Sequence, residues 1–147
     1  MKPNSASSSD AARTACRAGR HGSTFSASRA STTSRRNNLQ KKESQYTRCK
    51  GFDTFAPIGP CIARGLTDEA RTVEGWVNTE RRQASSTRFL IFPIELLVEF
   101  VTFVMTLEPG DIIATGTPEG IGPIHAGDTV TVKVECVGEL KNPVQDE

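Results

Sequence analysis

The stretch TVTVKVEC, residues 129 to 136, alternates strictly between apolar and polar side chains. A period of two is typical of a β-strand with one buried and one solvent-facing side. The apolar members are Val130, Val132, Val134 and Cys136, and the polar members are Thr129, Thr131, Lys133 and Glu135. This stretch therefore predicts that the core of the protein is built on a β-sheet.

The segments around this strand indicate short strands joined by turns. AGD, residues 126–128, predicts a turn, and LEPGDIIATG, residues 107–116, predicts a type II turn and then a strand. TVEGWVNTERRQ, residues 72–83, is typical of a β-hairpin whose turn falls near Asn78. FDTFAPIGPCIA, residues 52–63, contains two prolines and a glycine, so we expect extended chain broken by turns.

The longest apolar stretch is FLIFPIELLVEFVTFVMTL, residues 89–107. Its length raises the question of a membrane span, but Pro93 fits the first turn of a helix, and Glu95 and Glu99 interrupt the run. The spacing instead predicts an amphipathic helix that covers a core. Its polar stripe is Glu95, Glu99, Thr102 and Thr106, and its apolar side is Ile94, Leu97, Val98, Val101 and Met105.

The first 36 residues differ in composition from the rest of the 147-residue chain. They contain no Ile, Leu or Val, and they carry seven Lys and Arg against a single Asp, whereas the other 111 residues carry eleven basic and sixteen acidic side chains. A segment with so little to bury cannot offset the entropy cost of ordering. We therefore expect a disordered tail over residues 1–36 and a folded domain over residues 37–147.

Three interpretations of the basic tail stay open. It can be a solvated extension, an organelle transit peptide, or a mis-joined piece of reading frame; a nucleic-acid interface is disfavoured because no aromatic residues are interleaved with the arginines. A cytoplasmic protein is expected under the first interpretation and an organellar one under the second. Neither nucleic acid nor a membrane is expected as a partner.

The cysteines show no spacing that suggests a zinc site or a disulfide framework. They are Cys16, Cys49, Cys61 and Cys136. Isolated cysteines of this kind are typical of small buried hydrophobic residues. Of the two histidines, only His125 lies outside the tail, and its place in a predicted turn does not favour a role as general base.

The glycine-rich stretch ATGTPEGIGP, residues 114–123, raises the question of a phosphate-binding loop. Such loops need G-x-x-x-x-G-K-[ST] or G-x-G-x-x-G leading into a helix, because backbone N–H groups at the helix start bind the anion. Here no lysine follows the glycines Gly116, Gly120 and Gly122, and the next predicted element is a strand. The phosphate interpretation therefore fails.

Several motifs together resemble the C-terminal catalytic domain of the fumarylacetoacetate hydrolase family. They are LQKKESQYTR (39–48), KGFDTFAPIGP (50–60), RRQASSTRFLIFPIELL (81–97), MTLEPGDIIATGTPEGIGP (105–123) and GELKNPV (138–144). The combination of MTLEPGD with TGTP-x-G is highly specific. The resemblance covers about residues 39–144, which is roughly the C-terminal half of that domain, so we expect the chain to lack part of the domain on its N-terminal side.

The resemblance implies a fold and a chemistry. The fold is a β-rich α+β class, here part of a mixed β-roll or barrel with one packing helix, and it usually forms homodimers. The implied activity is metal-dependent hydrolysis or isomerisation of small oxo or diketo acids, by carbon–carbon bond cleavage or keto–enol chemistry. A hard cation such as Mg²⁺, or Mn²⁺ or Ca²⁺ in its place, can neutralise the enolate that forms.

The resemblance also implies site residues. Lys50 matches a lysine beside the metal that stabilises charge, and Thr54 matches a threonine in the metal's outer surroundings. Gln40 matches a substrate-contacting glutamine. Gly116 and Thr117 match the part of TGTP that holds the substrate carboxylate. Taken alone, each has a simpler interpretation as a surface or turn residue.

The carboxylates that should bind the metal are not found in the sequence. The family has a Glu-x-Glu pair upstream of the lysine, but residues 1–42 contain no glutamate, and Thr33 stands where the next acidic ligand is expected. A hydroxyl is a poor substitute for a carboxylate at a Mg²⁺ site. The alternative interpretation is therefore a catalytically inactive fragment or pseudoenzyme, which serves as a structural or dimerising half-domain.

Overall fold

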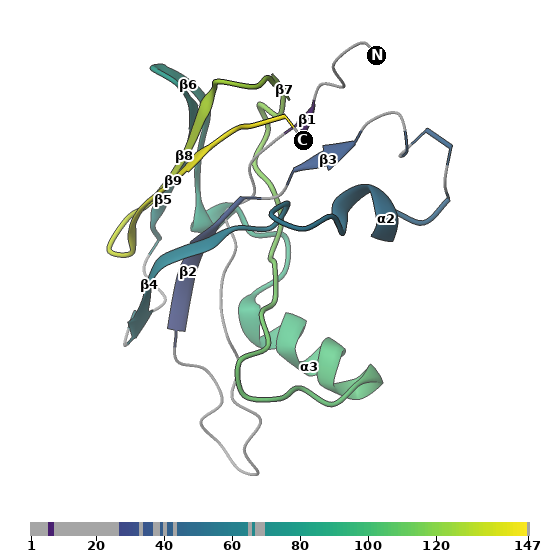
Figure 1. Ribbon diagram of the computed structural model, residues 1–147. Coiled ribbons are helices and arrows are strands. Elements are labelled where there is room, and N and C mark those ends of the chain that lie inside the picture. The colour runs from purple at the N-terminus through teal and green to yellow at the C-terminus, as the bar shows by residue number, and fades with distance from the viewer. Residues whose placement is uncertain are drawn as a thin grey trace.

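The computed structural model describes residues 6–7, 27–32, 34–36, 39, 41–42, 44–64, 66 and 70–146. These residues form short strands, two α-helices and one 3-10 helix (Figure 1). In chain order the elements are β1 (Ala6–Ser7), β2 (Ala27–Ser31), β3 (Arg35–Arg36), α2 (Thr47–Lys50), β4 (Ile58–Arg64), β5 (Thr72–Val77), β6 (Glu80–Ser86), η1 (Thr87–Phe89), α3 (Ile94–Val104), β7 (Pro123–Ile124), β8 (Thr129–Val134) and β9 (Gly138–Pro143).

The largest unit is a four-stranded antiparallel sheet in the order β6-β5-β8-β9. The predicted strand at 129–136 forms its centre as β8, and Val130, Val132 and Val134 are buried as expected. The prediction was wrong at two positions. Cys136 lies in the turn after the strand, with a φ of 61°, and is exposed. Thr131 is buried because Trp76 of β5 pairs with it across the sheet.

The predicted hairpin at residues 72–83 is confirmed as β5 and β6, with the turn at Asn78. Asn78 adopts a φ of 55°, a region that asparagine tolerates better than most residues. Its side-chain oxygen accepts a hydrogen bond from the backbone N–H of Thr129 at 2.9 Å. The turn is therefore fastened to the start of β8.

A second layer, made of β2 and β4, packs on this sheet. Its central residue is Ala30, which is fully buried in one apolar cluster with Val73, Val132, Val134 and Val137. Strand β2 pairs antiparallel with β4. Residues 27–31 and 35–36 were expected to belong to a disordered tail, but they form strands β2 and β3. The ladder to β4 satisfies the backbone of β2, and the small side chain of Ala30 fits against the valines.

The smallest sheet has the order β3-β1-β7 and lies near the C-terminal end of the chain (Figure 1). Ile124 of β7 packs with Val77 and Val130, so this corner continues the core of the four-stranded sheet. Apart from residues 6 and 7, the first 26 residues lie outside the part of the chain described, and so does Cys16. The prediction of disorder there stays a prediction.

The predicted amphipathic helix is confirmed as α3, which begins after Pro93 and ends at Val104. Ile94, Leu97, Val98 and Val101 are half-buried, as the pattern predicts. However, Met105 is exposed, and none of the helix residues is fully buried. The helix therefore covers the core less completely than its pattern suggests, and Figure 1 shows it apart from the four-stranded sheet. No helix among the described residues is long and apolar enough to cross a membrane.

The segment after α3 is less regular than predicted. The turn at Pro109 and Gly110 is confirmed, with Asp111 N–H bonded to the Glu108 carbonyl at 3.0 Å. The strand expected over residues 111–116 is absent, since only Ile112 makes an isolated bridge. The turn predicted at 126–128 is present. Extended chain at 52–63 is confirmed in β4, which follows a turn.

The cysteines also differ in part from prediction. Cys49 is buried as expected, but Cys61 and Cys136 are exposed, and all three are free thiols. Cys61 lies on β4, where its thiol donates to the Val137 carbonyl at 3.0 Å. This contact explains how an exposed cysteine is accommodated at the edge of the layer.

Candidate functional site

A cavity of about 250 Å³ lies between the end of the β5–β6 hairpin and the loop that follows α3. Val73 of β5 and Val134 of β8 contribute to its lining, so it opens on the edge of the sheet core. The other lining residues are Ser85, Ser86, Thr87, Phe89, Leu90, Ile91, Phe92, Leu97, Thr115, Gly116, Thr117 and Pro118. Its volume is slightly below that of typical ligand sites, which begin at about 300 Å³, so it suits a small molecule.

The loop containing Gly116 and Thr117 contributes backbone to this cavity. Gly116 has a φ of 130°, and apart from its two neighbours in the chain no residue lies within 4 Å of the position where a Cβ would be. The backbone at Gly116 is therefore open to a ligand. Both residues predicted to hold a carboxylate line the same cavity.

Strand β6 holds this loop in place. The buried amide of Gln83 donates to the Pro118 carbonyl at 2.9 Å, and the Arg82 guanidinium donates to the Pro123 carbonyl at 2.8 Å. Gly120 packs directly on the Arg82 carbonyl, where no side chain would fit. The loop is thus fastened at three points to β6, at and beside the place where the β5–β6 ladder shifts register, which limits its motion.

Hydroxyl groups line another part of the cavity. Ser85 and Ser86 end β6, and Thr87 begins η1. Ser86 Oγ accepts from the backbone N–H of Arg88 at 3.4 Å, and Thr87 Oγ1 accepts from that of Arg71 at 2.9 Å. Each oxygen accepts a hydrogen bond from the backbone, and each hydroxyl keeps the capacity to donate its own proton to a ligand.

The remaining predicted site residues do not line this cavity. Lys50, the last residue of α2, is exposed, and so is Thr54, which has a φ of 67°. Gln40 and Thr33 lie outside the described residues. The structure therefore brings Gly116 and Thr117 together at the cavity, but it does not bring Lys50 or Thr54 to that wall.

The described residues do not fit the metal site that the family resemblance implies. Within them, no three His, Cys, Asp or Glu side chains are grouped closely enough to hold a metal ion. The cavity itself is lined by hydroxyls and apolar groups, which bind divalent cations poorly. Ligands for Mg²⁺ would have to come from outside these residues.

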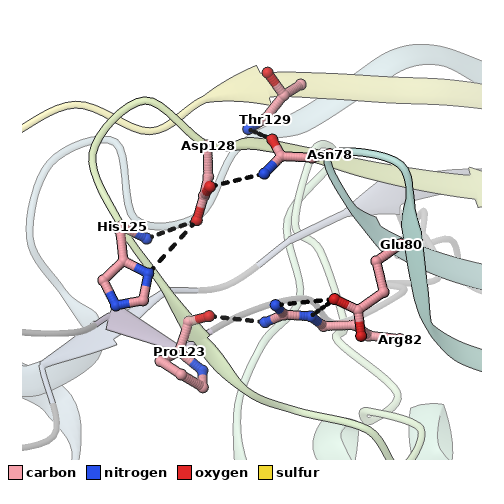
Figure 2. Close-up of polar contacts among 7 residues, drawn as sticks. All are labelled: Asn78, Glu80, Arg82, Pro123, His125, Asp128 and Thr129. Carbon is pink, nitrogen blue, oxygen red and sulfur yellow. Dashed lines mark hydrogen bonds and ion pairs between the residues drawn. The ribbon is translucent and has the colours of Figure 1, made fainter.

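His125 takes part in a polar cluster at the far end of β7, which Figure 2 shows. Its backbone N–H donates to Asp128 at 2.9 Å, and its Nδ1 lies 3.8 Å from the same carboxylate. The Asn78 side chain donates to the other oxygen of Asp128 at 2.8 Å. The hydrogen bonds from Asn78 and from the His125 backbone lower the pKa of Asp128. His125 does not line the cavity, and these contacts give it a role in the turn.

Sequence reasoning missed the serines and threonine of the cavity and the glutamine that fastens the loop. Gln83 and Ser85 to Thr87 lie within RRQASSTRF, residues 81–89, a stretch that supports the family resemblance but does not by itself indicate a binding site. A polar run at the end of a hairpin has no periodic signal that marks it as part of a site. One available clue was a hydroxyl cluster immediately before an apolar run.

The comparisons with known proteins agree on one family. Residues 28–145 match the model of the fumarylacetoacetate hydrolase C-terminal domain. An uncharacterized protein of Methanocaldococcus jannaschii is 50% identical over 109 residues, which make up 74% of this chain and 46% of that protein. The mitochondrial oxaloacetate tautomerase FAHD1 of Arabidopsis thaliana is 35% identical over 102 residues, or 68% of this chain and 46% of that one.

The fold is shared with a solved enzyme. The crystal structure of 5-carboxymethyl-2-hydroxymuconate delta-isomerase from Mycobacterium smegmatis matches with a TM-score of 0.83 at 37% identity, over 98% of this chain and 58% of that chain. The chain spans about half the length of the curated relatives that it matches. The family and the fold predicted from the motifs are confirmed, and the matched domain, the identities and the shared fold show that the chain belongs to the fumarylacetoacetate hydrolase family.

Proposed function

We propose that this chain supplies the substrate-binding wall of an enzyme that hydrolyses or isomerises small oxo or diketo acids. The observation that carries the proposal is the position of Gly116 and Thr117 on the wall of a cavity that is also lined by four other hydroxyl residues, Ser85, Ser86, Thr87 and Thr115. A carboxylate at this loop would meet backbone N–H and hydroxyl donors, which are the groups that anions need. The names of the two enzymes compared above support a keto–enol or isomerisation reaction in particular.

Each wall of the cavity would have a definite part in binding. Thr117 would donate its hydroxyl to the substrate carboxylate, and the exposed backbone at Gly116 would let the acid approach closely. Gln83 would keep the loop in the binding geometry through its bond to the Pro118 carbonyl. Ser85, Ser86 and Thr87 would donate to keto or enol oxygens, where such donors stabilise developing charge.

Lys50 is proposed to stabilise negative charge, Gln40 to contact substrate oxygens, and Thr54 to lie in the metal's outer surroundings. Since the exposed Lys50 does not line the cavity, its role requires the ligand to extend beyond this wall towards α2. Mg²⁺, Mn²⁺ or Ca²⁺ stays a prediction. If one binds, it supplies a positive charge that stabilises an enolate.

Binding is tested with Thr117→Val, which removes the hydroxyl and keeps the shape. We expect the dissociation constant for acetylpyruvate to rise about 10- to 100-fold, because a hydrogen bond to a charged group contributes about 1.5–3 kcal/mol. The matched control is Thr102→Val on α3, whose hydroxyl bonds only to carbonyls of its own helix. An equal effect of both variants would contradict a role for Thr117 in binding.

Catalysis is tested by following the loss of an acylpyruvate by its absorbance, in the chain and in Lys50→Ala. We expect measurable turnover that the variant loses. The exposed Lys42 provides the control Lys42→Ala, which should keep it. Binding without turnover would instead favour the inactive half-domain. Titration of Mg²⁺ by calorimetry tests the metal separately, and absence of binding at millimolar concentration would contradict metal-dependent catalysis.

We further propose that the chain forms homodimers through the outer side of α3. The support is a group of large apolar side chains that are exposed there: Leu96, Phe100, Phe103 and Val104. A group of exposed large apolar side chains on one helix is typical of an interaction site. A second copy of the chain offers the same surface and can cover it by two-fold symmetry.

A further inference from the structure

We infer that Arg82 is a positioning residue for the acid site, which holds the loop of Gly116 and Thr117 in the shape that binds a carboxylate. The inference rests on the proposed function, because it takes this loop to be the place where the acid head of the substrate binds. It goes further by making the affinity of the site depend on a guanidinium that does not line the cavity.

Arg82 lies at an irregularity in the edge strand β6. The ladder with β5 pairs Arg81 with Trp76 and then Gln83 with Gly75. Arg82 is therefore the extra residue between two pairs, on the outermost strand of the sheet. An extra residue of this kind bends a sheet edge and redirects the side chain at that point. The shift in register thus leaves the groups of Arg82 available to the loop beside the strand.

Arg82 contacts this loop twice, and Figure 2 shows the contact made by its side chain. The Nη1 of the guanidinium donates to the Pro123 carbonyl at 2.8 Å. The backbone carbonyl of Arg82 meets the loop again at Gly120, where an added Cβ would overlap its oxygen. Because a hydrogen bond from a charged donor is stronger than one between neutral groups, the contact at Pro123 is a firm one.

Glu80 fixes the direction of the guanidinium. One oxygen of its carboxylate accepts hydrogen bonds from Nε and Nη2 of Arg82, each at 3.3 Å. Since the Glu80 side chain is 69% exposed, this ion pair contributes little to stability by itself. Its effect is geometric: a planar guanidinium that is held at two nitrogens has its third nitrogen directed at Pro123.

The two side chains that tie the loop to β6 act at its two ends. The Gln83 amide holds the Pro118 carbonyl, next to Thr117, and Arg82 holds the Pro123 carbonyl. If the second tie is lost, the backbone that follows Thr117 is anchored at one end only. A ligand must then order the loop when it binds, and this ordering lowers its affinity.

The test replaces Arg82 and its neighbour Arg81 by alanine. Both arginines belong to β6, but Arg81 bonds to Glu74 and lies over the Trp76 ring, and none of these three lines the cavity. Calorimetry measures the dissociation constant for acetylpyruvate. We expect it to rise at least about tenfold in Arg82→Ala and to change by less than about twofold in Arg81→Ala.

Two further readouts distinguish positioning from a general loss of stability. Hydrogen exchange followed by mass spectrometry should become faster in residues 115–123 of Arg82→Ala and stay unchanged in β8. Guanidinium chloride at millimolar concentration, far below the molar range that unfolds proteins, should restore binding to Arg82→Ala by filling the vacated place. It should not restore binding to Thr117→Val, which lacks the group that contacts the ligand.

Two milder variants keep the test decisive if Arg82→Ala does not fold, which circular dichroism shows. Arg82→Lys keeps the charge but loses the planar fork, so we expect it to bind acetylpyruvate as weakly as the alanine variant. Glu80→Gln keeps the shape of an exposed side chain, and we expect it to weaken binding by about two- to fivefold, the size of an exposed ion pair.

The outcomes separate this inference from the proposed function. If the unmodified chain binds acetylpyruvate and the Arg82 variants bind it equally well, Arg82 does not position the loop, while the acid site still stands. Equal losses in Arg82→Ala and Arg81→Ala would also contradict the inference, because the effect would then belong to the strand as a whole. If the unmodified chain does not bind acetylpyruvate, the acid site itself is wrong, and the inference falls with it.

Discussion

The four-stranded sheet and helix α3 are both rich in apolar residues, but they use them differently. Within the sheet, Val130, Val132 and Val134 are buried by neighbouring strands and by the β2–β4 layer. On α3 and the segment before it, Ile91 is 89% exposed and Phe103 is 90% exposed. The sheet completes its core within the described chain, whereas the apolar surface around α3 does not.

The contrast separates residues that stabilise the fold from residues that are available for binding. Burial of apolar surface is the main favourable term in folding, so the valines of β8 should determine stability. Exposed phenylalanines contribute little to it, and they remain available for a ligand or another copy of the chain. The loop from Thr115 to Gly122 lies between the two regions. Its contacts with Arg82 and Gln83 of β6 hold it in place.

The largest difference in stability between the two regions is expected when a charged side chain is placed in each. We expect Val132→Asp to destabilise the chain by at least ~3 kcal/mol, because an unpaired carboxylate would be buried at a position that is 2% exposed. Urea unfolding followed by circular dichroism measures the change. The control Phe103→Asp should change stability by about 0.5 kcal/mol or less. Similar losses in both variants would mean that α3 is as well covered as the sheet.

The second test breaks the junction between the two regions. Gly120 and Gly127 have similar φ values of 96° and 89°, but only at Gly120 would a Cβ overlap another atom, the Arg82 carbonyl oxygen. Both alanine variants bear the backbone strain of about 1–2 kcal/mol. We expect Gly120→Ala to cost about 1–3 kcal/mol more, and to weaken oxo-acid binding as well.

Thermal unfolding and ligand titration of both glycine variants check this expectation. Gly127 lies in the turn before β8, away from the cavity lining, so Gly127→Ala should leave binding unchanged. If the two variants lose the same stability and bind alike, the loop is not held by β6 in the way the contacts indicate.

Much of the sheet could be predicted from sequence because its signals are local. The alternation of apolar and polar residues at 129–136 predicts β8. The position of Asn78 within residues 72–83 predicts the turn of the hairpin formed by β5 and β6. The errors come from tertiary context. Thr131 is buried by its partners across the sheet, and Ala27–Ser31 is ordered by pairing with β4, neither of which composition alone can indicate.

The candidate site was only partly predictable, for a different reason. Gly116 and Thr117 were identified through a specific motif, and they do share a cavity. Ser85 to Thr87 and Gln83 reach the same place from β6 and the start of η1, about thirty residues earlier in the chain, so no local pattern could connect them. On the helix side predicted to cover the core, Met105 is exposed and the other members are only half-buried, because periodicity shows which side of a helix is apolar but not what covers it.

The third test sharpens the contrast on its exposed side. We expect the double substitution Phe100→Ser and Phe103→Ser to weaken self-association strongly and to change the unfolding free energy of the dilute chain by about 0.5 kcal/mol or less per residue. Sedimentation velocity over a range of concentrations measures the first effect. Ile121→Ser is the control, since Ile121 is similarly apolar but lies outside α3. Unchanged association in the double variant would place the interface elsewhere.

The smallest expected effect is a change in the pKa of Asp128 when Asn78 is replaced in the hairpin turn, which is held by polar contacts. Asn78→Gly removes both the hydrogen bond to Asp128 and the one accepted from the Thr129 backbone N–H, and keeps a residue that tolerates a φ of 55°. The hydrogen bond from Asn78 is the largest cause of the lowered pKa of Asp128, so we expect the pKa to rise toward its ordinary value of 3.8 in the variant. NMR titration of the side-chain carboxyl measures it, and Glu135, whose pKa is lowered by bonds from Thr72, serves as the internal control.

The sign of the pH dependence follows from the direction of this shift. Because folding lowers the pKa of Asp128, its contribution to stability is fully present above the unfolded value near 3.8 and is lost as the pH falls through the lower folded value. In Asn78→Gly the gap between the two values narrows, so stability should fall less steeply below about pH 4. An acid unfolding curve with the same slope in both proteins would show that Asn78 does not act through Asp128. Asn78 would then act through its contacts with Thr129, whose backbone N–H donates to the Asn78 side-chain oxygen.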